Sequence, residues 1–131
     1  VRQATATLKP DKVVYYSNYI DTEDSWSNDI YLKRLQRGVG LGEKMSAAFE
    51  ESFSEGYNDV IIIGTDCLEL TRQILNEAFE KLKNNDVVIG PARDGGYYLL
   101  GMKKLHPEFF ENKSWSTSPV FSDTIADIEN L

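Results

Sequence analysis

VIIIGTDCLELT, residues Val60–Thr71, is the stretch of sequence that decides the fold. It opens with four β-branched residues, and an unbroken run of this kind is typical of a strand buried on both faces within a parallel sheet. Gly64 ends the run, and Asp66 follows just beyond the carboxyl end of the strand, where open α/β sheets bind ligands. Thr71 is a suitable N-cap for the next helix. We therefore expect a central strand with parallel neighbours and one carboxylate facing a crevice.

A second stretch has the same organisation. GPARDGGYYLLG, residues Gly90–Gly101, begins where the β-branched run Val87–Ile89 ends, and it carries Asp94. Acids at the ends of two neighbouring strands can together hold a hard divalent cation against phosphate oxygens. The alternative is that Asp66 and Asp94 are both turn residues, since aspartate is common in turns. The residues alone leave both interpretations open.

Composition limits the possible functions. The 131 residues fit a single domain with a real core. A net charge of −7 argues against nonspecific nucleic-acid binding and anionic-membrane binding. It leaves a nucleotide substrate possible, because a metal can make the phosphate contacts. There is no apolar run of membrane-spanning length and no signal peptide, so we expect a cytoplasmic protein without membrane insertion. Because the chain begins at Val1 without methionine, we expect a segment in front of it.

Helical periodicity is clearest over Leu41–Glu55, and Gly56 fits the position that ends this helix. A second helix is predicted over Arg72–Asn84. The apolar face of the first helix comprises Leu41, Met45, Ala48, Phe49 and Phe53. The remaining strands are predicted over Lys12–Ser17, Ile30–Leu35, Asp86–Ile89 and Gly96–Met102. A last helix is predicted with Ser118 as its N-cap and Pro119 as its first residue.

Alternating strands and helices predict an α/β fold with a mainly parallel sheet. The connection Gly90–Gly95 is too short for a parallel crossover, so the last strand should be antiparallel to the one before it. The acidic loop Asn18–Asp29 is expected to be solvated, and His106 is expected to be a surface or capping residue. The chain has neither G-x-G-x-x-G nor G-x-x-x-x-G-K-[ST], so the dinucleotide and Walker-type interpretations have no support. Cys67, the single cysteine, has no histidine placed to activate it.

Four stretches run in the order and spacing of a known family of small bacterial proteins: Gln36–Met45, Gly64–Thr71, Asp86–Met102 and Trp115–Thr117. The chain resembles the DUF2064 family, whose members look like glycosyltransferases of the GT-A fold. They are also similar to the molybdenum-cofactor nucleotidyltransferases and the phospholactate guanylyltransferases. The resemblance covers most of the chain from Lys12 onward, and its most specific part is DVVIGPARDGGYYLLGM.

The resemblance implies a three-layer α/β/α sandwich in which a nucleotide or nucleotide sugar meets Mg²⁺ or Mn²⁺ at the strand ends. Asp66 matches the metal-binding acid, and Asp94 matches a second metal position or a group that orients and deprotonates an acceptor hydroxyl. Glycine backbone can approach a phosphate or acceptor group closely. The other residues implied to border this pocket are Gly95, Gly96, Trp115, Ser116 and Thr117. For Trp115, a core or lid position is an equal alternative.

The chain departs from the family pattern in two places. Leu68 stands where members usually have proline. The family also normally starts with a strand and a glycine- and lysine-containing loop ending in K-T-R-L, which would hold the nucleotide, and nothing like it occurs here. We therefore expect a metal-dependent nucleotidyl- or glycosyltransferase that lacks its N-terminal segment. The rival interpretation is a non-catalytic binding or regulatory module, and the sequence encoded before Val1 would separate the two.

Overall fold

The computed structural model describes residues 5–6, 8–64, 70–93, 95–111, 113, 115 and 119–129. In these residues five strands form two sheets, one of two strands and one of three. In chain order the elements are β1 (Lys12–Tyr16), β2 (Tyr31–Leu35), α2 (Gly40–Ser54), β3 (Val60–Ile63), α3 (Arg72–Lys83), β4 (Val87–Pro91), β5 (Tyr97–Met102), the 3-10 helix η1 (Pro107–Phe110) and α4 (Val120–Glu129). None of the described helices is both long and apolar enough to span a membrane.

The α/β class is confirmed, but the expected place of β3 is wrong. Within the described residues β3 is an edge strand of the order β3–β5–β4, and it pairs antiparallel with β5. Ile62, expected between parallel neighbours, lies opposite Leu100 and is only half-buried. The physical reason is that β5 returns after a short connection and inserts between β3 and β4, antiparallel to both. The predicted antiparallel pairing of β4 with β5 is confirmed, and the one parallel pair described is β1 with β2.

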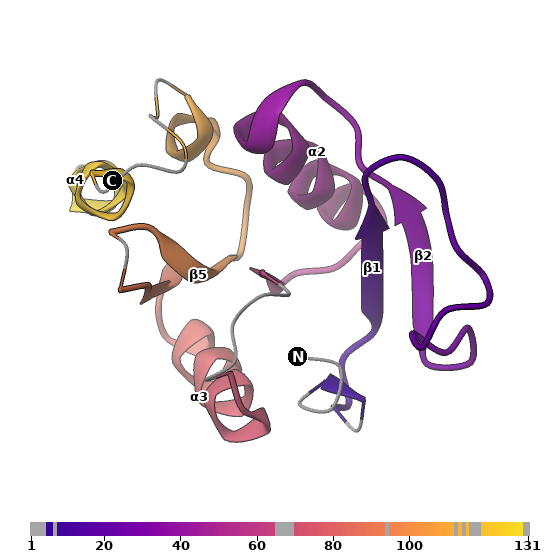
Figure 1. Cartoon of the computed structure of the whole chain (residues 1–131). Coiled ribbons are helices and arrows are strands. Elements are labelled where there is room, and N and C mark those ends of the chain that lie inside the picture. Colours follow the sequence, from indigo (N-terminus) through magenta and orange to yellow (C-terminus); the bar gives the residue numbers. More distant parts are fainter. Residues whose placement is uncertain are drawn as a thin grey trace.

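The side chains of β3 alternate between two hydrophobic clusters, as the period of a strand requires. Ile61 and Ile63 pack on the cluster that contains Leu75 and Ala78 of α3. Val60 and Ile62 pack on the cluster built around Phe49, which also contains Phe109 and Phe110. Helix α3 therefore covers one face of the three-stranded sheet, and α2 with η1 covers the other. Figure 1 shows α2 and α3 on opposite sides of the molecule, with β1 and β2 side by side at one end.

Gly38, in the loop before helix α2, and Gly40, the first residue of the helix, have φ of 108° and 81°, a region that favours glycine. It is followed by Gly56 at φ 101°, as predicted for the end of this helix. Phe49 is fully buried, as the periodicity predicts. Leu41 differs from the prediction because its side chain is 46% exposed, in the first turn of the helix.

A polar cluster around Glu51 of α2 holds the two-stranded sheet to the rest of the chain. The Tyr15 hydroxyl on β1 donates a hydrogen bond to Glu51 Oε2 at 2.9 Å. Arg37 Nε lies 2.5 Å from Glu51 Oε1, and Arg34 on β2 pairs with both Glu51 and Glu55. Because β1 and β2 are not paired with the other sheet in the part of the chain that the structure describes, these side chains supply a connection between the two sheets that strand pairing does not.

The acidic loop 18–29 is largely exposed, as predicted, but one of its acids has a partner. Asp24 forms an ion pair at 2.7 Å with Lys33, whose side chain is only 5% exposed. The hydrogen bond from Lys33 holds the pKa of Asp24 below its usual value. His106, expected to be a surface or capping residue, occupies the N-cap position of η1 without a side-chain capping hydrogen bond. A surface position is wrong for it, because its side chain is 6% exposed and stacks on Phe109 with 5.0 Å between ring centroids.

Thr71 caps α3 as predicted, and its replacement by alanine tests this cap. The Thr71 hydroxyl oxygen accepts a hydrogen bond from the backbone N–H of Ile74 at 3.2 Å. We expect Thr71→Ala to lower the free energy of unfolding by about 1 kcal/mol, because an N-terminal N–H of the helix loses its partner. Urea denaturation measures this. Thr22→Ala, in an exposed loop, is the matched control, and an equal loss in both variants would contradict the capping role.

Candidate active site

A cavity of about 750 Å³ separates β1 from β3. Its walls come from both sheets, from α2 and α3, and from the turn between β4 and β5. Most of the lining is apolar, and includes Val14 on β1, Ile62 on β3, Met45 on α2 and Phe79 on α3. This volume lies within the range of roughly 300–1,000 Å³ typical of small-molecule pockets.

The glycine turn predicted to approach a ligand borders this cavity through Gly96. Gly95 has φ of 91°, which favours glycine, and its N–H donates to the Ala92 carbonyl at 3.3 Å. The Gly95 carbonyl in turn accepts from the backbone N–H of Phe121 in α4 at 2.8 Å. The turn is therefore held from both sides, which gives the cavity a preorganised backbone edge.

Trp115 is half-buried and lines the same cavity, so it belongs to both the pocket and the core. Its indole packs edge-on against Tyr97, with 6.4 Å between ring centroids. It also lies directly against Gly42 in the first turn of α2. A Cβ added at Gly42 would come within 2.8 Å of Trp115 Nε1 and 2.7 Å of the Phe110 carbonyl oxygen. Glycine at this position therefore allows the indole to seat against the helix.

Three lining residues were given no role by the sequence analysis: Gln36, Lys44 and Tyr97. The hydroxyl of Tyr97 is buried without a hydrogen-bond partner among the described residues, and burial raises its pKa above the usual value. Lys44 projects from α2, one residue before Met45. Gln36 and Lys44 lie in Gln36–Met45, one of the stretches that carry the family resemblance. That resemblance is the sequence feature from which a role in the site could have been predicted for them.

The two predicted metal-binding acids, Asp66 and Asp94, lie outside the described residues, as do Ser116 and Thr117. The chain on either side of the acids is described. Gly64, two residues before Asp66, lines the cavity, and so do Ala92 and Gly96, two residues on either side of Asp94. The Gly64 N–H donates to the Tyr98 carbonyl at 3.2 Å. The described residues that flank Asp66 and Asp94 in the sequence thus line one cavity.

Elsewhere in the described chain, no group of three histidine, cysteine or acidic side chains is arranged to hold a metal ion. The assignment of Asp66 and Asp94 as metal ligands stays a prediction from the sequence.

Comparison with protein families matches residues 1–117 to the DUF2064 family, described as uncharacterized protein conserved in bacteria. This chain belongs to the DUF2064 family. Among solved structures, the DUF2064 chain is similar to a putative nucleotide-diphospho-sugar transferase from Desulfovibrio desulfuricans G20. The TM-score is 0.87 at 29% sequence identity, over 98% of this chain and 58% of that protein. The chain thus spans little more than half the length of that protein. No curated protein matches the sequence.

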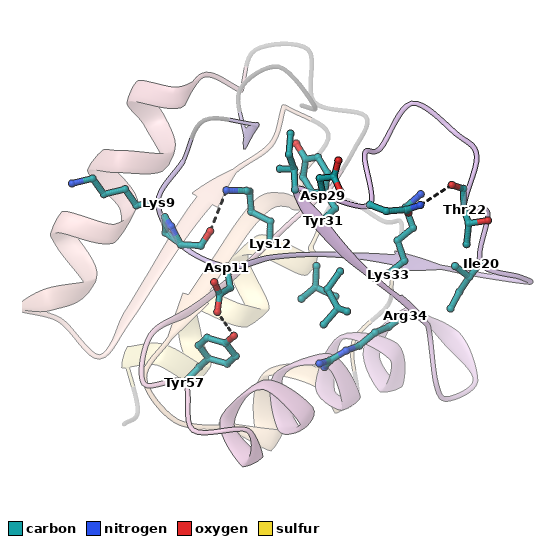
Figure 2. A pocket seen from close by; sticks show the side chains of 15 residues that line it. Lys9, Asp11, Lys12, Ile20, Thr22, Asp29, Tyr31, Lys33, Arg34 and Tyr57 are labelled. Atoms are coloured by element: carbon teal, nitrogen blue, oxygen red, sulfur yellow. Dashed lines mark hydrogen bonds between the residues drawn. The ribbon is translucent and has the colours of Figure 1, made fainter.

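The DUF2064 chain has a second cavity, of about 560 Å³, beside β1 and β2 (Figure 2). Several cations line it, but those with described contacts already have partners. Lys33 pairs with Asp24, Arg34 pairs with Glu55, and Lys12 donates to the backbone carbonyls of Leu8 and Pro10. A phosphate in this cavity would compete with these contacts, so the cavity between β1 and β3 is the better candidate site.

Proposed function

We propose that this chain forms part of a metal-dependent transferase that acts on a nucleotide sugar or a nucleoside triphosphate. The observation that carries the proposal is the structural likeness to the Desulfovibrio desulfuricans protein over 98% of this chain. The proposal includes the three-layer α/β/α sandwich. Its support is the placement of α3 on one face of the three-stranded sheet and of α2 with η1 on the other.

In this proposal different residues around the larger cavity bind different parts of the substrate. The half-buried indole of Trp115 offers an apolar surface to the uncharged part of the nucleotide, and the turn at Gly96 offers backbone to a phosphate or acceptor group. Of the two lysines that line the cavity, Lys12 already donates to carbonyl oxygens. Lys44 is therefore the better candidate for a phosphate contact.

Asp66 and Asp94 would hold the Mg²⁺ or Mn²⁺ ion, which when bound stabilises the negative charge of a leaving diphosphate or nucleotide. Asp94 is also the residue proposed to orient an acceptor hydroxyl and accept its proton. The other residues of the site orient the substrate. The turn held between Ala92 and Phe121, and the indole seated on Gly42, set where a substrate can lie.

Isothermal titration calorimetry tests the proposal with Mg²⁺ or Mn²⁺ and a panel of nucleoside triphosphates and nucleotide sugars. We expect weak or no binding to the 131-residue chain, because it carries a net charge of −7 and contains no glycine–lysine phosphate loop. Binding is expected in a longer form that also carries the starting strand and the glycine–lysine loop typical of the family.

The matched variants for this titration are Lys44→Ala and Lys104→Ala in the longer form. Lys104 is exposed and does not line the cavity, so only Lys44→Ala should weaken binding. Tight binding by the short chain would show that its own residues complete the site. Absence of binding in both forms would reject the transferase and favour a non-catalytic module.

A further inference from the structure

The first turn of helix α4 is bonded to the turn between β4 and β5. The backbone N–H of Phe121 donates to the Gly95 carbonyl at 2.8 Å. The first four N–H groups of a helix have no acceptor within the helix, so Gly95 gives Phe121 the partner that α4 itself lacks. Gly95 follows Asp94 in the sequence, and Val120, the first residue of α4, is 4% exposed and lines the larger cavity. The start of α4 therefore belongs to the wall of the candidate site.

The last turn of α4 is held by Lys113. The Lys113 ammonium lies 2.6 Å from Asp127 Oδ2, and it donates to the backbone carbonyls of Glu108 and Glu111 at 3.1 Å each. Its three N–H donors thus have acceptors, although the side chain is only 5% exposed. An acid in the last turn of a helix faces the negative end of the helix dipole, and α4 has no basic residue there to offset it. Lys113 supplies that positive charge from outside the helix and joins α4 to η1.

The two attachments lie on one packed helix. Asp127 follows Phe121 by six positions, which is about 9 Å along a helix. Thr124 lies between them and is 0% exposed, and Ile128 packs on the cluster around Phe49. Figure 1 shows α4 beside η1, at the same end of the molecule. Because closely packed groups transmit displacements, a shift of α4 at Asp127 should also be felt at Phe121.

We propose that Lys113 is a positioning residue of the candidate site: its ion pair with Asp127 fixes α4, and α4 fixes the turn that carries Asp94. Without the Asp127 carboxylate, the Lys113 charge stays buried with no counter-charge, which favours a shift of α4 away from η1. The bond from Phe121 to Gly95 then weakens, and the turn loses its support from α4. The family match ends at residue 117, so this device lies partly outside the matched region. Its effect on turnover rests on the proposed function, whereas the coupling of α4 to the turn does not.

Three variants of the 131-residue chain test this coupling. Asp127→Ala removes the carboxylate, and Asp127→Glu keeps the charge that Lys113 needs. Glu129→Gln is the matched control, because Glu129 is an exposed acid in the same last turn of α4. If Asp127→Ala fails to fold, Asp127→Asn takes its place, since asparagine keeps the size and one acceptor oxygen.

Hydrogen exchange of three backbone amides is the first measurement. The Phe121 amide reports the bond to Gly95, the Gly95 amide reports the turn through its bond to Ala92, and Leu100 in the central strand β5 reports the rest of the fold. In Asp127→Ala we expect exchange about tenfold faster at Phe121 and Gly95, with Leu100 unchanged. Asp127→Glu and Glu129→Gln should match the unsubstituted chain. Faster exchange at Phe121 alone would show that α4 moves without the turn, and equal acceleration at all three amides would show a merely structural role; either result would overturn the proposal.

Steady-state kinetics of the longer form, with Mn²⁺ varied, provide the second measurement. We expect Asp127→Ala to raise the Mn²⁺ concentration for half-maximal turnover by about tenfold, the lower end of the effect of losing a residue that orients a metal ligand. Asp127→Glu should restore it, and Glu129→Gln should leave it unchanged. An unchanged Mn²⁺ requirement in a variant whose Gly95 amide exchanges faster would overturn the role of the turn in the site. No turnover in the unsubstituted longer form would instead reject the transferase, and the exchange result would still decide the coupling.

Discussion

Phe49→Ala is expected to lower the free energy of unfolding by about 3–5 kcal/mol, the usual range when a fully buried aromatic side chain is removed. Phe49 is 0% exposed and lies at the centre of the cluster that joins α2, β5 and η1. Its ring packs on Phe53 at 6.2 Å and on Phe110 at 5.7 Å between centroids. Because the free energy of unfolding of a domain is only about 5–15 kcal/mol, this one substitution removes a large share of the stability.

Equilibrium urea denaturation, followed by circular dichroism, measures this loss. Phe53→Ala is the matched control, since it removes the same side chain from the same helix at a half-buried position. We expect the control to lose clearly less stability. If Phe53→Ala proved as damaging as Phe49→Ala, the cluster would not be centred where the structure places it.

Asp66→Asn is expected to reduce turnover of the longer form by about 10²–10³-fold, the effect of losing one group that stabilises transition-state charge. Asparagine keeps the size and one carbonyl oxygen, but it lacks the charge that a hard cation needs. Stability should change little, because the carboxylate is proposed to lie at the cavity and not in the core. Steady-state kinetics over a range of Mn²⁺ concentrations, combined with a thermal melt, measures both effects.

The control for this variant must be an acid without a structural partner. Asp24 is unsuitable, because it holds Lys33 and accepts a hydrogen bond from Tyr16. Asp86 is exposed at the start of β4 and suits the purpose, and Asp86→Asn should leave turnover unchanged. Near-normal turnover in Asp66→Asn would make Asp66 a turn residue, and loss of the fold would make its role structural.

Local features of this chain could be predicted from the sequence because their causes are local. Thr71 caps α3 by bonding three residues ahead, and Gly56 ends α2 through its own backbone conformation. The short connection predicted at Gly90–Gly95 allows only an antiparallel return, and the pairing of β4 with β5 confirms it. The apolar face of α2 likewise follows from helical spacing, with exposed Leu41 as the exception.

The features that were missed depend on distant partners. The run Val60–Ile63 correctly indicated a strand that packs on both faces. It carries no information about which strand pairs with it, and the partner in the structure is β5, which is antiparallel. Asp24 and Lys33 pair across a loop, and His106 is buried by stacking on Phe109. For the candidate site, Gly96 and Trp115 line one cavity, but their binding roles stay predictions, as do the roles of Asp66 and Asp94.

The absence of a side chain at Gly42 has a mechanical consequence for the cavity. Trp115 is at once a wall of the cavity and a direct neighbour of the first turn of α2, with too little space between them for even one methyl group. Close-packed neighbours transmit strain because they cannot be compressed. A ligand that displaces the Trp115 indole therefore also displaces α2, and through α2 it shifts Phe49 at the centre of the core. Ligand occupancy of the cavity and the packing of the hydrophobic core are thereby coupled through the first turn of α2.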